Sequence, residues 1–232
     1  MFKTVDISKT VSAIIFSFLL LLPAIGDNSL RGQGGELVKL PEPRFESEVS
    51  IEKALLKRRS LRQYTNKPLS LEQVSQLLWA AQGITSPQGF RTTPSAGALY
   101  PLEVYLAAGE VTGLPAGIYR YKPQGHALLK IAGEDKRAEL GEAALGQSCV
   151  KSGAAVIVIC AIFERTTGKY GERGLGYVHM EAGAASQNIY LQSVSLGLGT
   201  VVVGGFSPAK VKRVMNIKDN EQPLYLMPVG RK

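Results

Sequence analysis

Residues 154–163 read AAVIVICAIF, an apolar run in which β-branched side chains predominate. A continuous run of this kind is typical of a β-strand. A strand that is apolar at consecutive positions is buried on both of its faces. The run therefore predicts a central strand in a sheet that is covered on both sides.

Downstream of this strand, residues 177–196 have the length and composition of a long helix. The segment contains one acidic residue, Glu181, and a run of small residues from Ala182 to Ser186. A helix that is apolar all round must be covered all round. We therefore expect this helix to be buried against a partner subunit.

The remaining apolar patterns alternate between strand and helix periodicity. Ser70 and Gln73 have the spacing of a capping box, and Gly83 lies where a helix that starts there would end. Further strands are predicted at 102–108, 118–121, 127–131, 200–203 and 224–227, and helices at 51–58, 71–81, 135–145 and from 208 onward. The sum predicts one α+β domain, residues 49–232, with a central mixed sheet flanked by helices.

The first 26 residues have the three parts of a secretory signal peptide. Two lysines precede the apolar run 11–22, and Ala24 and Gly26 supply the small residues of a cleavage site. We expect an exported protein, periplasmic or extracellular, that stays tethered to the membrane if this segment is not cleaved. Residues 27–48 are polar and aperiodic, which predicts an extended arm or linker.

The sequence contains 27 lysine and arginine residues against 19 aspartate and glutamate residues, a formal net charge of +8. Most of the positive charge is scattered along the sequence, and no motif that would read nucleic-acid bases is evident. Nucleic acid is therefore not an expected partner. Two distant histidines and two cysteines, Cys149 and Cys160, are too few for a metal centre. The sequence does not decide whether the cysteines pair, although the apolar surroundings of Cys160 favour a buried thiol.

The dense part of the positive charge lies at the end of the helix predicted at 51–58. Arg58, Arg59, Ser60 and Arg62 place three guanidinium groups and a hydroxyl within five residues, a combination that suits phosphate binding. A solvated basic helix end would have the same composition. Arg231, near the C-terminus, is either a further contact of this kind or part of a charged tail.

Two other segments are rich in small residues. Ser95, Ala96 and Gly97 would let the backbone approach a flat ligand closely. Gly204 and Gly205 follow a predicted strand, where backbone N–H groups can face an acceptor atom. A plain loop and a tight turn would explain the same residues.

The order and spacing of these motifs resemble the FMN-dependent nitroreductase family. The resemblance is closest to its azoline-dehydrogenase branch, the SagB-like thiazole- and oxazole-forming dehydrogenases, and it covers about residues 49–231. It is carried by RRSLRQY (58–64), TPSAGALYPLEVYL (93–106), the segment 169–206 that begins KYGERGLGYVHMEAGAASQN, and MPVGR (227–231).

This resemblance implies a nitroreductase-like fold and a homodimer with FMN bound at the subunit interface. Arg58, Ser60 and Arg62 would match the N-terminal FMN contacts of the family, with Arg59 as the middle residue of the same motif. Arg231 would reach the phosphate from the C-terminus. NAD(P)H is the candidate electron donor.

The resemblance also implies contacts to the flavin ring. Ser95, Ala96 and Gly97 would line the isoalloxazine from the partner subunit. Gly204 and Gly205 match the segment whose backbone N–H faces flavin N5, the atom that accepts or donates hydride.

Lys169 and Tyr170 match a Lys-Tyr pair that the azoline-dehydrogenase branch uses near its substrate. In that role lysine acts as a base and tyrosine assists proton transfer; an exposed pair in a glycine-rich loop is the alternative. The implied activity is an FMN-dependent oxidoreductase that passes hydride or electrons through flavin N5 to or from a small organic substrate. Two alternatives remain: an exported flavin-binding module without turnover, and a basic surface-binding protein without flavin.

Overall fold

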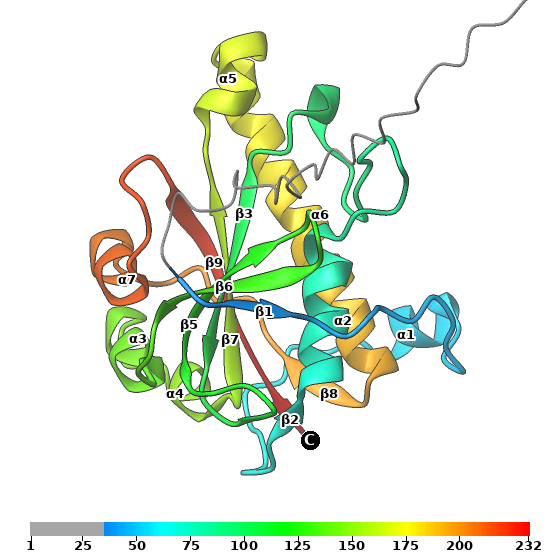
Figure 1. The fold of residues 1–232 in the computed structure, drawn as a ribbon, viewed down its shortest axis with the longest axis vertical. Helices are drawn as coiled ribbons and strands as arrows, with labels where there is room; N and C mark the ends of the chain where they lie inside the picture. The colour runs from blue at the N-terminus through cyan, green and yellow to red at the C-terminus, as the bar shows by residue number, and fades with distance from the viewer. Residues whose placement is uncertain (1–34) are drawn as a thin grey trace, which may run out of the picture. The chain divides into compact units, whose positions relative to one another are not determined.

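The structure is a computed structural model that describes residues 35–232; the predicted signal peptide, residues 1–26, lies outside the described residues. The AAVIVICAIF run contains strand β7 (Ala155–Ala161), in which all seven residues are buried. It lies inside a seven-stranded sheet, between β3 (Leu102–Ala108) and β9 (Gln222–Arg231) (Figure 1). The prediction of a central strand that is covered on both faces is confirmed.

The seven strands pair in an order that differs from their order in the chain. That order is β1 (Leu37–Lys39), β6 (Ala127–Ala132), β5 (Gly117–Lys122), β3, β7, β9 and β8 (Leu198–Thr200). Each of the six pairs is antiparallel. The prediction of a mixed sheet is therefore wrong for this sheet. Within residues 35–232, a parallel pair of strands occurs outside this sheet, between β2 (Leu69–Ser70) and β4 (Val111–Thr112).

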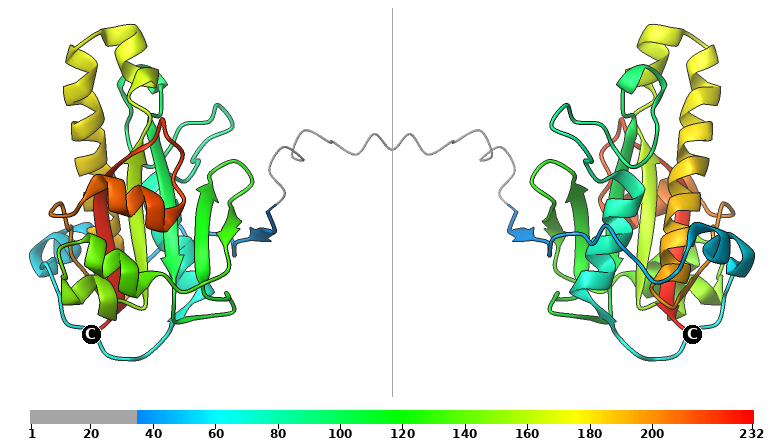
Figure 2. Two further views of the ribbon diagram at one scale, coloured as in Figure 1. Left: turned by 90° about the vertical axis from the view of Figure 1, so that its left-hand side faces the viewer. Right: turned by 90° about the vertical axis from the view of Figure 1, so that its right-hand side faces the viewer.

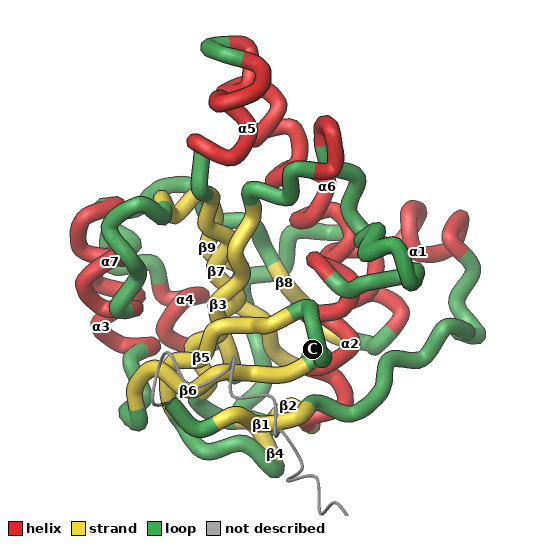
Figure 3. The backbone as a smooth tube through the Cα atoms, turned by 45° about the horizontal axis from the view of Figure 1, so that its top comes forward, coloured by secondary structure: helices red, strands yellow, loops and turns green. Residues whose placement is uncertain are grey.

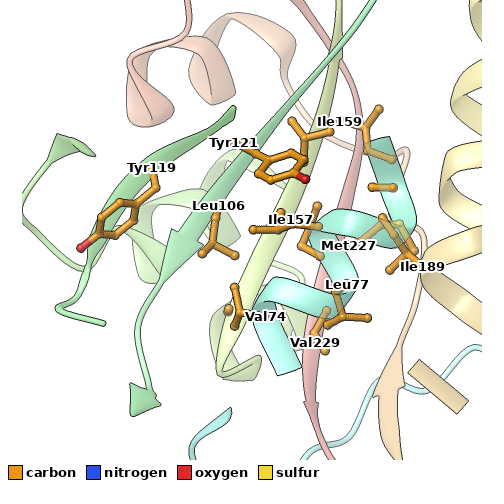
Figure 4. Close-up of a cluster of buried hydrophobic side chains, with 14 of the residues drawn as sticks. Val74, Leu77, Leu106, Tyr119, Tyr121, Ile157, Ile159, Ile189, Met227 and Val229 are labelled. Carbon is orange, nitrogen blue, oxygen red and sulfur yellow. The ribbon is translucent and has the colours of Figure 1, made fainter. Parts of the chain in front are cut away.

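Alternate residues of β7 belong to two apolar clusters on opposite faces of the sheet. Ile157 and Ile159 face the cluster that helices α2 (Leu71–Gln82) and α6 (Arg173–Ser195) complete (Figure 4). Val156 and Val158 face the cluster of α3 (Arg137–Ala143), α4 (Ser148–Ser152) and α7 (Pro208–Met215). The sheet is thus the middle layer of three, and Figure 3 shows the strands gathered between the helices.

The helices begin where the sequence supplies their caps. Ser70 and Gln73 form the predicted capping box of α2, and Gly83 is its C-cap. α1 (Ile51–Lys57) begins after Ser50, whose side chain accepts the N–H of Lys53. α5 (Glu164–Tyr170) leads directly into α6, and in Figure 2 these two helices extend beyond the others at one end of the domain.

Part of the predicted arm belongs to the sheet. Residues 37–39 form strand β1, which pairs antiparallel with β6 from Leu37–Leu129 to Lys39–Ala127. The sheet therefore begins before residue 49, and three residues of the arm are its edge strand.

Cys149 and Cys160 are both buried and unpaired. Within residues 35–232, no helix combines the length and apolar character that crossing a membrane requires. The same residues contain no cluster of three histidine, cysteine, aspartate or glutamate side chains that could hold a metal ion.

Candidate active site

Lys169 and Tyr170 lie at the end of α5 and contact the loop that precedes β3. A Cβ atom built on Gly97 would lie 2.7 Å from the Tyr170 hydroxyl and 3.1 Å from Lys169 Nζ. Gly171, with φ 56° and ψ −145°, then turns the chain into α6, in a conformation that glycine adopts most readily. The structure therefore brings together two predicted segments that are far apart in the sequence.

The loop that receives this pair has several residues in the left-handed region. Gly97 has φ 62°, and the non-glycine residues Ala98 and Tyr100 have φ 54° and 47°. Ser95 Oγ accepts the N–H of Tyr100 at 2.8 Å and so holds the turn together. Backbone strain of this kind persists where the surroundings enforce it, and it often marks functional sites.

Aromatic contacts connect the Lys-Tyr pair to α6. Lys169 Nζ lies 5.5 Å from the centroid of the Tyr170 ring, and the rings of Tyr170 and Tyr177 meet edge-on at 5.3 Å. Within one chain Lys169 is exposed and Tyr170 is half-buried. The ammonium group is therefore open to a ligand, while the tyrosine has a fixed position.

On the α6 side of the same loop lies a cavity of about 320 Å³. It is lined by Pro94, Ser95, Ala96, Tyr177, Met180, Glu181 and Ala184. Glu181 is 5% exposed, and its Oε1 has no hydrogen-bond partner. Burial raises the pKa of this carboxyl to about 7, although a hydrogen bond from Ser95 and the charge of Arg91 lower it in part.

Glu181 was not among the predicted site residues. Its signal was nevertheless present in the sequence, because it is the one acidic residue of a long apolar helix. A single acid on such a helix has to face either solvent or a site, and the sequence alone does not distinguish these two positions.

The predicted phosphate-binding residues are joined to the other end of α6 through Tyr190. The guanidinium of Arg58 lies 5.1 Å from the centroid of the Tyr190 ring, and Ser60 Oγ lies 2.9 Å from the Tyr190 hydroxyl. The same hydroxyl accepts the N–H of Val202 at 2.9 Å. Tyr190 therefore positions both the basic segment and the chain that leads to Gly204. It was missed because an aromatic residue on an apolar helix is usually part of the core.

The other arginines of the basic segment have different surroundings. Arg59 turns back on its own helix end, where its Nη1 donates to Arg58 O at 2.7 Å and to Leu56 O at 3.1 Å. Arg62 is exposed. Arg59 therefore caps α1. Arg58 and Ser60 are held in place by Tyr190, and Arg62 is exposed, so these three residues are the better placed members of the motif to face an anion.

Gly204 and Gly205 follow the bridge between Val203 and Leu226 and are both exposed. Nothing in the chain lies within 4 Å of a Cβ built on Gly204. Gln147 donates from Nε2 to the carbonyl of Gly205 at 2.9 Å. The backbone of this segment is thus accessible to a ligand, and the Gln147 side chain holds it in place.

Arg231 is engaged at the start of α2. Its Nε donates to Pro68 O at 2.9 Å and its Nη2 to Gln73 Oε1 at 3.3 Å, while its carbonyl accepts the N–H of Thr65. Its backbone therefore runs beside the basic segment, but its guanidinium contacts the capping box. The predicted phosphate contact of Arg231 would require this side chain to change partners.

The predicted residues thus form two groups along α6. Tyr177 and Glu181, with the loop around Gly97 and the Lys169–Tyr170 pair, lie towards its N-terminus, and the Tyr190 group lies towards its C-terminus. Glu181 and Tyr190 are nine positions apart, which corresponds to about 13 Å along a helix axis.

Comparison with known proteins identifies the class of this domain. The sequence pattern of the Nitroreductase family matches residues 55–231. A protein of Methanocaldococcus jannaschii that is named as a nitroreductase is 46% identical over 198 residues, which cover 85% of this chain and 98% of that protein. The microcin B17-processing protein McbC of Escherichia coli is 32% identical over 156 residues, which cover 64% of this chain and 57% of McbC.

Solved structures agree with the sequence comparison. A structure from Anabaena variabilis described as a nitroreductase is 30% identical with a TM-score of 0.75; the match covers 85% of this chain and 42% of that chain. A structure from Ralstonia eutropha is 31% identical with a TM-score of 0.72; the match covers 84% of this chain and 89% of that chain. A chain of the E. coli microcin synthetase McbBCD complex is 25% identical with a TM-score of 0.65; the match covers 94% of this chain and 85% of that chain.

The fold and these similarities define a flavin oxidoreductase of the nitroreductase type. The chain belongs to the nitroreductase family over residues 55–231, and the predicted nitroreductase-like fold is confirmed.

Proposed function

We propose that this protein is an FMN-dependent oxidoreductase that passes hydride or electrons through flavin N5 to or from a small organic substrate. The observation that carries the proposal is the meeting of the Lys169–Tyr170 pair with Gly97, within 3.1 Å of where a side chain would begin. A base and a hydroxyl beside a small-residue loop are suited to proton transfer next to a flat cofactor.

The residues of the chain fit FMN. Arg58 and Arg62 supply guanidinium forks and Ser60 a hydroxyl, the groups that suit a phosphate. Gly204 and Gly205 present bare backbone at which a flavin ring can lie closely. When bound, FMN would supply the hydride chemistry at N5; the protein orients the reactants and moves protons.

We propose that two copies form a homodimer and that Ser95, Ala96 and Gly97 line the flavin bound mainly by the partner subunit. Large apolar side chains on α1 and α6 are exposed in the single chain and would be covered by a second copy. They are Ile51, Leu55, Leu56, Leu175 and Met180, which are 44–74% exposed.

Within the family, we propose the azoline-dehydrogenase branch. The Lys169–Tyr170 pair and the similarity to McbC support this assignment. The solved McbBCD structure has truncated pro-MccB17 bound, whereas we propose a small organic substrate for this chain. NAD(P)H is the proposed electron donor.

A visible absorption spectrum of the purified protein, repeated after addition of FMN and desalting, tests the proposal. We expect a bound-flavin band in stoichiometric amount, which anaerobic NAD(P)H bleaches and an organic acceptor restores. A protein that does not retain FMN contradicts the proposal. A protein that retains FMN but turns over no faster than free flavin is the binding module instead.

The N-terminal 26 residues support a further proposal, export to the periplasm or beyond. Mass spectrometry of the protein recovered from each cell fraction tests it. We expect a chain that begins at residue 27 outside the cytoplasm, and a full-length cytoplasmic chain would contradict export.

A further inference from the structure

The cavity between the loop 94–97 and α6 contains a carboxyl group with one oxygen that the chain leaves without a hydrogen-bond partner. Glu181 is 5% exposed, and its Oε1 is buried without a hydrogen-bond partner. The other walls are mostly apolar, from Pro94, Ala96, Met180, Ala184 and the ring of Tyr177. An apolar pocket with one polar group at a defined place is the usual composition of a small-molecule site.

A buried carboxyl with one oxygen unpaired is costly when it is charged, and burial therefore favours its protonated form. The pKa of Glu181 is accordingly raised by burial to about 7. The cation that opposes this shift is Arg91, whose guanidinium is engaged elsewhere: it donates to Gln82 Oε1 at 2.8 Å and lies 4.4 Å from the centroid of the Tyr100 ring. Near neutral pH the carboxyl is therefore divided between its protonated and charged forms, so it can both donate and accept a proton.

The position of the carboxyl relates it to the other groups of the site. Its cavity contacts the loop at Ser95 and Ala96, and the Lys169–Tyr170 pair contacts the same loop at Gly97. Tyr177 lines the cavity and also touches the Tyr170 ring. The other charged or titratable groups around this loop are Arg91, Tyr100, Arg165, Tyr177 and the Lys169–Tyr170 pair; Arg165 donates from Nη1 to the carbonyl of Tyr100 at 2.8 Å.

We propose that Glu181 is an acid–base residue of this enzyme and that its pocket binds a small, largely apolar substrate. This inference rests on the proposed function, which supplies hydride from reduced flavin. A substrate that takes up hydride at carbon or nitrogen gains an electron pair on the neighbouring heteroatom. The O–H bond of the Glu181 carboxyl then breaks and a heteroatom–H bond forms. The carboxylate regains its proton from water, and in the oxidative direction it accepts the proton from the substrate.

The test compares Glu181→Gln with Glu172→Gln. Glutamine keeps the shape of the side chain but has no transferable proton, and Glu172 is an exposed acid at the turn before α6. Glu181→Asp is the second variant, because it keeps an acid at the position if the amide disturbs packing.

The first readout does not depend on turnover. Infrared-monitored pH titration should show one carboxyl that titrates near pH 7 in the unaltered protein and in Glu172→Gln, and that is missing from Glu181→Gln. The proposal is wrong if this band is absent from the unaltered protein or persists in Glu181→Gln.

The second readout is the reduction of a small nitroarene by NAD(P)H, with the FMN-loaded protein as the catalyst, at pH 5.5 to 8.5. We expect kcat to fall by about 10²–10⁴-fold in Glu181→Gln, with FMN retention unchanged and the pH dependence near 7 lost. Glu181→Asp should retain that dependence. An unaltered kcat and pH profile in Glu181→Gln would overturn the inference. A protein that never retains FMN would instead contradict the proposed function, and the proton transfer would fail with it.

Discussion

The hydroxyl groups of Ser60 and Tyr190 lie 2.9 Å apart, and this contact joins the basic segment to α6. The Tyr190 oxygen also accepts the N–H of Val202 at 2.9 Å, and its ring lies beneath the guanidinium of Arg58. A single tyrosine thereby sets the position of the proposed phosphate site relative to the chain that leads to Gly204.

Replacing Tyr190 with phenylalanine should weaken both stability and FMN binding. The ring stays, but the N–H of Val202 loses its partner, which costs about 1–3 kcal/mol when such a group is buried. Urea unfolding measures the stability, and fluorescence titration measures FMN affinity. Tyr225→Phe is the matched control, since Tyr225 is half-buried and its hydroxyl has no hydrogen-bond partner among residues 35–232. Equal effects in the two variants would contradict the role of Tyr190.

Replacing Arg58 with alanine should weaken FMN binding with little effect on folding. A charge-assisted hydrogen bond to phosphate is worth roughly 1.5–3 kcal/mol, which corresponds to about one to two decades in Kd. Lys57→Ala removes the same charge one residue earlier, on an exposed position of α1, and should change Kd much less. Equal losses of FMN affinity in both variants would show that Arg58 acts only through its positive charge and makes no specific contact with the phosphate.

The elements that could be predicted from sequence are those with strong local signals. The run that forms β7 and the capping box of α2 each have a pattern that one structure explains. β1 has three residues, too few for a periodic pattern, and its partner β6 lies about ninety positions away. The antiparallel direction of the strand pairs could not be predicted from the sequence either, because tertiary packing rather than local sequence decides which strands pair.

The candidate site shows the same division. Arg58, Ser60 and the Lys169–Tyr170 pair have recognisable motifs. That Tyr170 meets Gly97 depends on how α5 returns to the loop, and that Glu181 is buried depends on which face of α6 the loop covers. No spacing within either segment carries that information.

Replacing Gly97 with alanine should disturb the site more than the fold. Its φ of 62° costs alanine about 1–2 kcal/mol, and the new Cβ would lie 2.7 Å from the Tyr170 hydroxyl. Gly89 is the matched control: its φ is 83°, but a Cβ there meets nothing within 4 Å. We expect similar losses of thermal stability in both variants and a loss of turnover in Gly97→Ala alone. Full turnover in Gly97→Ala would show that the Tyr170 position is unimportant.

A buried ion cluster should be the most sensitive part of the scaffold. Arg120 pairs with Glu103 at 2.9 Å and with Glu221 at 3.0 Å, and Glu221 is fully buried. Arg120→Met would leave the buried Glu221 carboxylate without a cation, while Glu103 would keep its pair with Arg165 at 2.7 Å; an uncompensated buried charge costs about 3–5 kcal/mol. Lys39→Met, which breaks an exposed pair with Glu42, should have no measurable effect. Urea unfolding of both variants measures the change in the free energy of unfolding. Small and similar losses in the two variants would show that the buried cluster does not stabilise the fold.

His126 connects the N-terminal segment to the body of the domain and should make stability depend on pH. Its Nε2 lies 2.6 Å from Ser75 Oγ and 3.1 Å from Pro41 O, and its Nδ1 lies 2.8 Å from the Tyr121 hydroxyl. Burial lowers the pKa of His126 below its ordinary value of 6.5. The folded protein therefore binds fewer protons than the unfolded chain in the range just below pH 6.5.

Because protons favour the unfolded chain there, the contribution of His126 is complete above pH 6.5 and is lost as the pH falls through the folded pKa. Glu181 acts with the opposite sign, since its raised pKa makes the folded protein bind more protons between pH 4.5 and 7. The difference between variants isolates the histidine. His126→Asn, which tolerates the φ of 46°, should remove part of the decline in unfolding free energy between pH 7 and pH 5, whereas the exposed His179→Asn should not. Urea midpoints at pH 7, 6 and 5 measure this, and parallel pH curves for His126→Asn and the unaltered protein would show that His126 does not titrate with folding.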